Sequence, residues 1–221
     1  MTNSRDLLPA GGVKNTAWTL DNPSIPPYGK FSVIAQESLP AEVFFKDDGL
    51  KMYVLGTTGD DVNEYDLSTA WNVSTASFLQ NFSVAAQETT PTSVFFKPDG
   101  LKMYVLGASG DAVYEYDLST AWNVSTASYL QNFSVVSQET NPYGLFFKPD
   151  GTVMYIVGTI ADAVYSYDLS TAWNVSTASW NAPADSYFSV LSEETTPNGL
   201  FFKPDGLKMY VIGIVGDDVN E

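Results

Sequence analysis

Residues 82–132 read FSVAAQETTPTSVFFKPDGLKMYVLGASGDAVYEYDLSTAWNVSTASYLQN, and this stretch decides the fold because the chain repeats it. Residues 31–81 form another copy, in which about 40 of the 51 residues are identical. A third copy covers 133–187 and contains a four-residue insertion at Trp180 to Pro183, and a fourth begins at Phe188 and reaches Glu221. Self-similarity at a period of this length predicts a repeat architecture.

Each copy contains four short segments that are typical of β-strands. In the second copy they are residues 91–97, 101–107, 112–118 and 127–135, rich in Val, Phe, Tyr and Leu. The segment 101–107, LKMYVLG, is almost entirely apolar, which favours a strand buried on both faces. Gly and Pro fall between these segments, and no window has a helical period.

Four antiparallel strands in each repeat indicate the blade of a β-propeller. We therefore predict an all-β propeller of four blades, whose ring is closed by pairing of strands from the two ends of the chain. Residues 1–12 are expected to be a tail and 13–221 a single propeller domain, in which 13–38 complete the partial fourth repeat 188–221. Two alternatives stay open: a longer parent protein with roughly five to eight blades, or a ring shared by two chains.

The string at 96–105, FKPDGLKMYV, recurs at 202–211, and in the second copy it is followed by the strand at 112–118, AVYEYDL. It resembles the Pro-Asp-Gly propeller repeats of the TolB-like and YVTN-type families, and the whole repeat is similar to tandem propeller repeats in phage structural proteins and marine bacterial surface proteins. The first copy departs from the motif at 47–49, DDG, where the proline is missing. The resemblance implies the fold and leaves the ligand open.

Composition excludes several classes of function. The chain has 10 Lys plus Arg against 26 Asp plus Glu, a net charge of −16, which would repel nucleic acid and anionic membranes. It has no histidine and no cysteine, so Ser-His-Asp and Cys-His catalysis and thiolate metal sites are absent. No segment is long and apolar enough for membrane insertion. Any enzymatic mechanism must use carboxylates, Lys, Tyr or Ser.

Two sets of acidic residues are expected to share one rim of the propeller, where they could ligate Ca²⁺, which takes six to eight oxygen ligands. The alternative is that they cap turns and solvate the rim, and no loop matches the Asp-x-Asp-x-Asp-Gly calcium pattern. The candidate metal ligands are Glu37, Glu88, Glu139, Glu194, Asp60, Asp111, Asp162 and Asp217.

A tryptophan followed by an asparagine recurs on the opposite rim. An exposed indole can stack on a sugar while the amide binds its hydroxyl groups. The alternative is that each tryptophan fills the gap between neighbouring blades. The candidate ligand-binding residues are Trp71, Trp122, Trp173, Asn72, Asn123 and Asn174, with Trp18 as the amino-terminal equivalent.

These observations favour a non-enzymatic binding or assembly module, with multivalent recognition of carbohydrate or a protein surface on a virion or cell exterior. Symmetric copies offer no acid that differs from its partners, as paired acid–base chemistry requires. One alternative is a carboxylate-based, possibly calcium-dependent hydrolase, and another is a purely structural repeat of a larger particle. We expect a monomer, with a shared-ring oligomer as the alternative, and no cofactor other than calcium.

Overall fold

The computed structural model describes residues 29–180, 186–216 and 218–221, and these residues form four antiparallel sheets with no long helix. We call the sheets blades 1 to 4 in chain order. Blade 1 comprises β1 (Pro40–Phe45), β2 (Lys51–Gly56), β3 (Asp61–Leu67), the 3₁₀-helix η1 (Val73–Thr75) and β4 (Ala76–Ser83). Blade 2 comprises β5 (Pro91–Phe96), β6 (Lys102–Gly107), β7 (Ala112–Leu118), η2 (Val124–Thr126) and β8 (Ala127–Ser134). Blade 3 comprises β9 (Pro142–Phe147), β10 (Val153–Gly158), β11 (Ala163–Leu169), η3 (Val175–Thr177), β12 (Ala178–Ser179) and β13 (Tyr187–Ser189), and blade 4 comprises β14 (Pro197–Phe202), β15 (Met209–Gly213) and β16 (Val219–Asn220).

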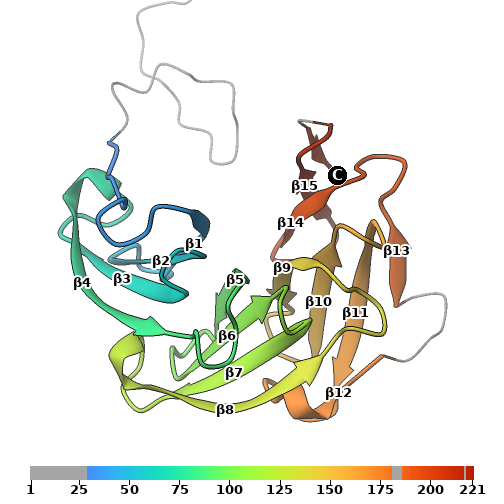
Figure 1. Ribbon diagram of the computed structural model, residues 1–221, viewed down its shortest axis with the longest axis horizontal. Helices are drawn as coiled ribbons and strands as arrows, with labels where there is room; N and C mark the ends of the chain where they lie inside the picture. The colour runs from blue at the N-terminus through green and yellow to red at the C-terminus, as the bar shows by residue number, and fades with distance from the viewer. Residues whose placement is uncertain (1–28, 181–185, 217) are drawn as a thin grey trace, which may run out of the picture.

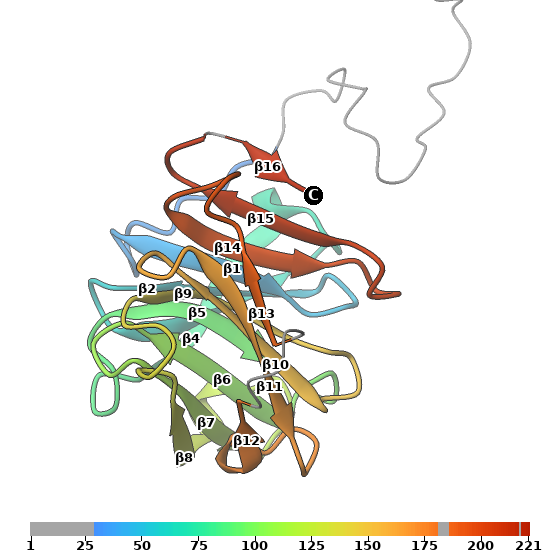
Figure 2. The ribbon, with the colours of Figure 1, turned by 90° about the vertical axis from the view of Figure 1, so that its right-hand side faces the viewer.

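The blades follow one another around a common axis, so the predicted all-β propeller of four blades is confirmed. The first strands β1, β5, β9 and β14 lie next to one another on the inner side, and β4 and β8 lie on the outer side (Figure 1). Seen from the side, β14, β15 and β16 lie across the top of the molecule (Figure 2). Strand order within each blade follows chain order, except that β13 pairs with β11 in blade 3.

The middle strands are buried on both faces, as their apolar sequences predict. On β6, Met103 and Val105 pack in a cluster with Tyr53 of blade 1, whereas Tyr104 packs in a second cluster with Phe147 of blade 3. Successive side chains of a strand point to opposite faces, so an unbroken apolar run contacts both neighbouring blades. The hydrophobic core is therefore a series of layers between blades.

The Pro-Asp-Gly turn joins the first two strands of blade 2. Gly100 has a φ of 72°, in the left-handed region that glycine adopts without strain. The carboxylate of Asp99 accepts a hydrogen bond of 3.0 Å from the Leu101 N–H, and its other oxygen lies 2.6 Å from the Lys97 ammonium. Equivalent bonds to the N–H groups of Leu50, Thr152 and Leu207 hold the same turn in the other three blades, although blade 1 lacks the proline.

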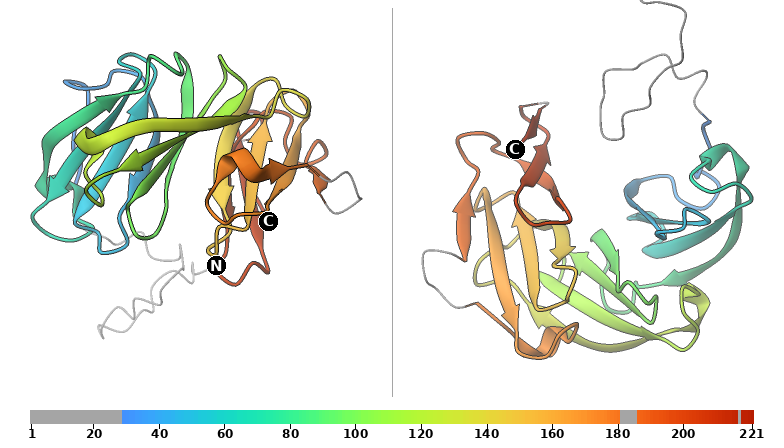
Figure 3. Two further views of the ribbon diagram at one scale, coloured as in Figure 1. Left: turned by 90° about the horizontal axis from the view of Figure 1, so that it is seen from below. Right: turned by 180° about the vertical axis from the view of Figure 1, so that it is seen from behind.

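The fourth blade has three strands in the described part of the chain. Of the segment 13–38 that was expected to complete it, residues 29–38 contain no strand, and 13–28 lie outside the described residues. Phe31 instead packs edge-on against Tyr65 of blade 1, with ring centroids 5.4 Å apart, as Phe82 packs against Tyr116 of blade 2. Blades 1 and 4 are the two ends of the arc of blades, and the view from behind shows them on opposite sides of it (Figure 3).

The insertion in the third repeat divides the outer strand of blade 3. Both β12 and β13 pair with β11, and residues 181–185 between them lie outside the described residues. In the described ranges, no helix is long and apolar enough to cross a membrane.

Candidate functional site

The carboxylates of the four rim glutamates accept hydrogen bonds from backbone N–H groups. Glu88 is 1 % exposed, and its carboxylate accepts hydrogen bonds from the N–H groups of Thr90, Ser109 and Gly110, at 2.7, 3.1 and 3.0 Å. Gly107 has no side chain, and the Glu88 side chain packs against it. The same arrangement holds at Glu37, Glu139 and Glu194. Each glutamate therefore ties together the two loops of its rim.

The rim aspartates adopt the left-handed conformation, with φ of 51° at Asp60, 47° at Asp111 and 48° at Asp162. One carboxylate oxygen, Oδ1, of each is buried without a hydrogen-bond partner. Burial raises the pKa of Asp60 and of Asp111, and in both cases the nearby Glu88 carboxylate adds to the effect. Asp217 lies outside the described residues.

The acidic rim does not gather these carboxylates around one point. Across residues 29–180, 186–216 and 218–221, no group of three or more acidic side chains is placed to hold a metal ion. The glutamate oxygens already accept backbone hydrogen bonds, which leaves the turn-capping alternative as the role that the geometry supports.

Two of the repeated tryptophans lie between blades. The Trp122 indole stacks on Phe96 of its own blade, with centroids 5.6 Å apart, and on Phe44 of blade 1, at 6.5 Å. Lys46 lies 5.8 Å from the centre of the ring. Trp173 stacks in the same way on Phe147 and Phe95 and is 8 % exposed. In each case the two phenylalanine rings lie side by side, and a glycine, Gly100 or Gly151, packs directly against the indole. Trp173 is therefore buried and closed to a sugar, whereas Trp122 is half-buried.

The asparagines next to these tryptophans are also engaged. Asn123 caps η2, where its side-chain oxygen accepts hydrogen bonds from the N–H and hydroxyl of Ser125 at 3.1 and 2.7 Å. It also accepts one of 2.7 Å from Gln80 of blade 1. Asn72 and Asn174 cap η1 and η3 in the same way. The amides therefore stabilise the loops that carry the tryptophans.

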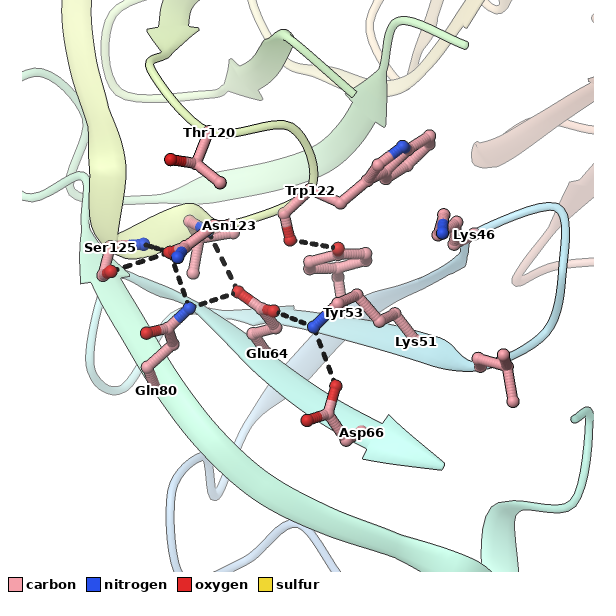
Figure 4. Close-up of polar contacts among 12 residues, drawn as sticks. Lys46, Lys51, Tyr53, Glu64, Asp66, Gln80, Thr120, Trp122, Asn123 and Ser125 are labelled. Carbon is pink, nitrogen blue, oxygen red and sulfur yellow. Dashed lines mark hydrogen bonds and ion pairs between the residues drawn. The ribbon is translucent and has the colours of Figure 1, made fainter. Parts of the chain in front are cut away.

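A buried glutamate completes the contact between blades 1 and 2. Glu64 is fully buried and accepts hydrogen bonds from Gln80 at 2.8 Å, from the Val124 N–H at 3.0 Å and from the Lys51 ammonium (Figure 4). Glu115 makes the equivalent contacts between blades 2 and 3. Buried charge is tolerated here because every oxygen has a charged or hydrogen-bonding partner.

Trp71 differs from its equivalents because it belongs to blade 1, at the end of the arc. It packs on Phe45 of its own blade, with centroids 5.5 Å apart, and is 59 % exposed. Among the three sequence-predicted tryptophans that the structure describes, Trp71 has the most exposed indole, and none of the described tryptophans stacks on it.

The inner strands carry a residue set that the sequence analysis did not select. Glu42 of β1 and Ser93, Gly144 and Gly199 of the next three inner strands occupy the same register, opposite Leu55 and its equivalents in the second strands. Glu42 is thus an acid without a counterpart in the other blades. At the preceding position, the blades carry Ala41, Thr92, Tyr143 and Asn198.

Glu42 lies at the junction of blades 1 and 2. It is partly buried, and Oε2 accepts a hydrogen bond of 2.5 Å from the Val94 N–H of β5. Burial raises the pKa of Glu42 to about 7, while the Val94 N–H and the Ser93 hydroxyl lower it by less. A carboxyl that titrates near neutral pH can take up and release protons under physiological conditions.

A signal for this site was present in the sequence. The copies are almost identical, and residues 41 and 42 are among the few positions where their chemical type changes from blade to blade. β1 begins at Pro40 and places both residues on an inner strand.

Comparisons with known proteins find similar structures but no similar sequence. No protein-family model and no curated sequence matches the chain. Among solved structures, a proposed 6-phosphogluconolactonase from Bacteroides uniformis has a TM-score of 0.58 at 14 % identity over 81 % of this chain and 49 % of that one. The Pseudomonas aeruginosa periplasmic gluconolactonase PpgL has a TM-score of 0.52 at 17 % identity, over 80 % and 47 %. The β-propeller domain of Cps50 (Swd1) from Myceliophteria thermophila has a TM-score of 0.52 at 11 % identity, over 82 % and 52 %.

This chain therefore spans about half the length of each of these three structures. Two of them are lactonases by name, so the expectation of a non-enzymatic binding module is corrected: this propeller resembles hydrolases, and the alternative reading is the better supported one. The argument from symmetry was also wrong, because Glu42 is an acid that differs from its counterparts. What the comparisons establish is the fold, a β-propeller.

Proposed function

We propose that this chain is a carboxylate-based hydrolase in which Glu42 acts as general base on the inner strands. One observation carries the proposal. Burial raises the pKa of Glu42 to about 7, and the residues at the same strand position in the other blades have no carboxyl group. Enzymes commonly tune a glutamate toward neutral pH by burial for this role. The lactonase names among the structural neighbours support hydrolysis of a cyclic ester.

The reaction balances with one carboxyl group. The Glu42 carboxylate removes a proton from water as the hydroxide oxygen bonds to the lactone carbonyl carbon. The tetrahedral intermediate collapses by breaking the ring C–O bond, and the leaving oxygen takes the proton back from the Glu42 carboxyl. The product is the open hydroxy acid, and Glu42 returns to its starting state. Tyr143 and Asn198, both partly exposed on neighbouring inner strands, are candidate hydrogen-bond donors to the carbonyl oxygen.

Charge favours an uncharged substrate over a phosphorylated one. The net charge is −16, and residues 29–221 contain no arginine, the residue best suited to bidentate phosphate binding. A neutral sugar lactone therefore fits the site better than its 6-phosphate.

The test is hydrolysis of glucono-δ-lactone, followed in a pH-stat against the uncatalysed rate, with 6-phosphogluconolactone as the comparison. We expect turnover of the neutral lactone that falls at least 100-fold in Glu42→Gln and persists in Glu193→Gln, which removes an exposed acid. Parallel runs with Ca²⁺ and with a chelator test the calcium dependence. A rate equal to background for every lactone would refute the proposal.

We also propose that the repeats belong to the Pro-Asp-Gly group of TolB-like and YVTN-type propellers. The turn supports this assignment: in blades 2 and 4 an aspartate bonds the N–H two residues on, and a glycine follows at φ of 72°. A sequence profile built from those families that aligned 96–118 in register with their blade motif would support it, and an alignment out of register would contradict it.

A further inference from the structure

An empty tryptophan slot lies between blades 3 and 4. Its lining includes Phe146 and Tyr155 of blade 3 and Phe202 and Gly206 of blade 4, around a cavity of about 260 Å³. The equivalent residues between blades 1 and 2 surround the Trp122 indole, which lies directly against Gly100. Apart from its chain neighbours, nothing in the described part of the chain lies within 4 Å of the position that a Cβ on Gly206 would occupy, although Gly206 shares the left-handed φ of 72°. The slot is therefore shaped for an indole that the described residues do not supply.

A second unfilled surface is the free face of blade 4. Phe201 and Tyr210 line a hollow of about 680 Å³, and their rings lie 6.4 Å apart. They correspond to Phe44 and Tyr53 of blade 1, whose rings lie 6.5 Å apart and cover Trp122. At the other end of the arc, no blade within the described ranges precedes blade 1 to cover its Trp71.

The free face of blade 4 and the exposed Trp71 of blade 1 correspond to the two sides of the contact that blades 1 and 2 make with each other. We propose that a second copy of this chain docks its blade 1 on the free face of blade 4, with its Trp71 against Phe201 and Tyr210. The segment that precedes blade 1 of that copy then completes blade 4. Because each copy has one face of each kind, a twofold pair satisfies both faces in one shared ring.

The amino-terminal sequence carries the residue that the slot lacks. Thr16, Ala17 and Trp18 match Thr69, Ala70 and Trp71, and they lie outside the described residues. Trp18 precedes Phe31 by 13 residues, whereas Trp122 precedes Phe133 by 11, so the spacing fits a blade with a slightly longer connection. Phe31 already packs on Tyr65 as the outer strand of a preceding blade would. The occupant of the slot is therefore Trp18 of the second copy.

Polar groups at the two ends also match. Glu221 pairs with Lys208, as Glu64 pairs with Lys51. Glu64 accepts a hydrogen bond from the Val124 N–H of the following blade. In the docked pair, Glu221 would meet the N–H of Val73 from the second copy in the same way.

The experiment is the mass of the full 221-residue chain in solution, by light scattering at several concentrations. The pair predicts twice 24.1 kDa, about 48 kDa. Phe201→Lys, which places a charge on an exposed position of the free face, should weaken association at least tenfold without unfolding blade 4. Ile160→Lys, an exposed apolar residue away from both faces, is the matched control and should leave the mass unchanged.

Trp18→Ala tests the occupant of the slot, with Trp180→Ala as its control. We expect Trp18→Ala alone to raise the dissociation constant at least tenfold. A monomer of 24.1 kDa at every concentration overturns the proposal, and so does a dimer that Phe201→Lys and Trp18→Ala leave intact. A monomer in which Trp18 is buried would mean that the chain fills its own slot. Lactone turnover is measured separately, so failure of this pairing and failure of the proposed hydrolase are distinguishable.

Discussion

The Tyr53 hydroxyl of blade 1 donates a hydrogen bond of 2.7 Å to the main-chain carbonyl of Trp122 in blade 2. Tyr104 and Trp173 repeat this bond between blades 2 and 3, also at 2.7 Å. The bond fixes the loop that carries the indole, and the indole in turn fills the space between two sheets. The same set of contacts is therefore repeated between successive blades.

Removing one of these indoles should reduce the stability of the fold. Trp122→Ala leaves a cavity between Gly100 and the rings of Phe44 and Phe96, and we expect a loss of about 3 to 5 kcal/mol in the free energy of unfolding. Trp180→Ala removes a ring that is 37 % exposed and should cost less than about 1 kcal/mol. Urea denaturation of both variants provides the comparison, and equal losses would show that the slots do not carry the packing energy.

The rim glutamates should make the fold sensitive to acid. Burial opposes ionisation of Glu37, but hydrogen bonds from Leu39, Thr58 and Gly59 outweigh it and lower its pKa. A carboxyl with a lowered pKa in the folded state contributes stability above its unfolded pKa and loses it as the pH falls through the folded value. Glu37→Gln should therefore lose about 1 to 3 kcal/mol at pH 7 and show a smaller decline between pH 5 and 3. Thermal melts between pH 5 and 3 provide the measurement. Equal declines in the stability of the variant and the parent would contradict a role for the Glu37 carboxylate.

Blade 3 provides a natural test of the buried ion pair. Val153 and Ser166 of that blade stand at the register positions of Lys51 and Glu64 in blade 1. Lys51→Val alone leaves the Glu64 carboxylate buried without its cation and should cost about 3 to 5 kcal/mol. The double variant Lys51→Val/Glu64→Ser copies blade 3 and should recover at least half of that loss. Additive effects in a double-mutant cycle would show that the two side chains are not coupled.

Glu42 should reduce stability as the pH rises. Its folded pKa of about 7 lies above its value in the unfolded chain, near 4.5. The unfolded state therefore ionises first, and stability falls between pH 4.5 and 7 before levelling off. Glu42→Gln removes this effect and should be more stable than the parent at pH 8, by up to on the order of 3 kcal/mol, and similar at pH 4. The comparison is made by urea unfolding at the two pH values, and a variant that is less stable at pH 8 would contradict the raised pKa.

The fold could be predicted almost residue by residue, because the repeat supplies several copies of each strand and turn. The segment 101–107 became β6 with one residue fewer, and 112–118 became β7 without change. The roles of the rim residues were harder to predict, since near-identity between copies is produced by duplication as well as by function. Glu88 reads equally well as a metal ligand or as an acceptor of three N–H groups until the positions of Ser109 and Gly110 are known.

The raised pKa of Glu42 could not be predicted from the sequence either. Its pKa depends on burial between β1 and β5, which is set by how two blades pack. Pairwise comparison of the copies marks residue 42 as different, and the strand predicted at 91–97 has its counterpart there, but sequence alone does not show the contact of Glu42 with β5. The variation within a repeat protein is thus informative once the strand register is known.

The most direct test of the hydrolase account is the pH dependence of kcat/KM for glucono-δ-lactone, measured with the full chain and with Glu42→Gln. The account predicts a rate that rises with a midpoint near pH 7, as the Glu42 carboxyl ionises, and that loses this step in the variant. A profile that follows only the uncatalysed reaction, or that keeps the same midpoint in Glu42→Gln, would contradict it.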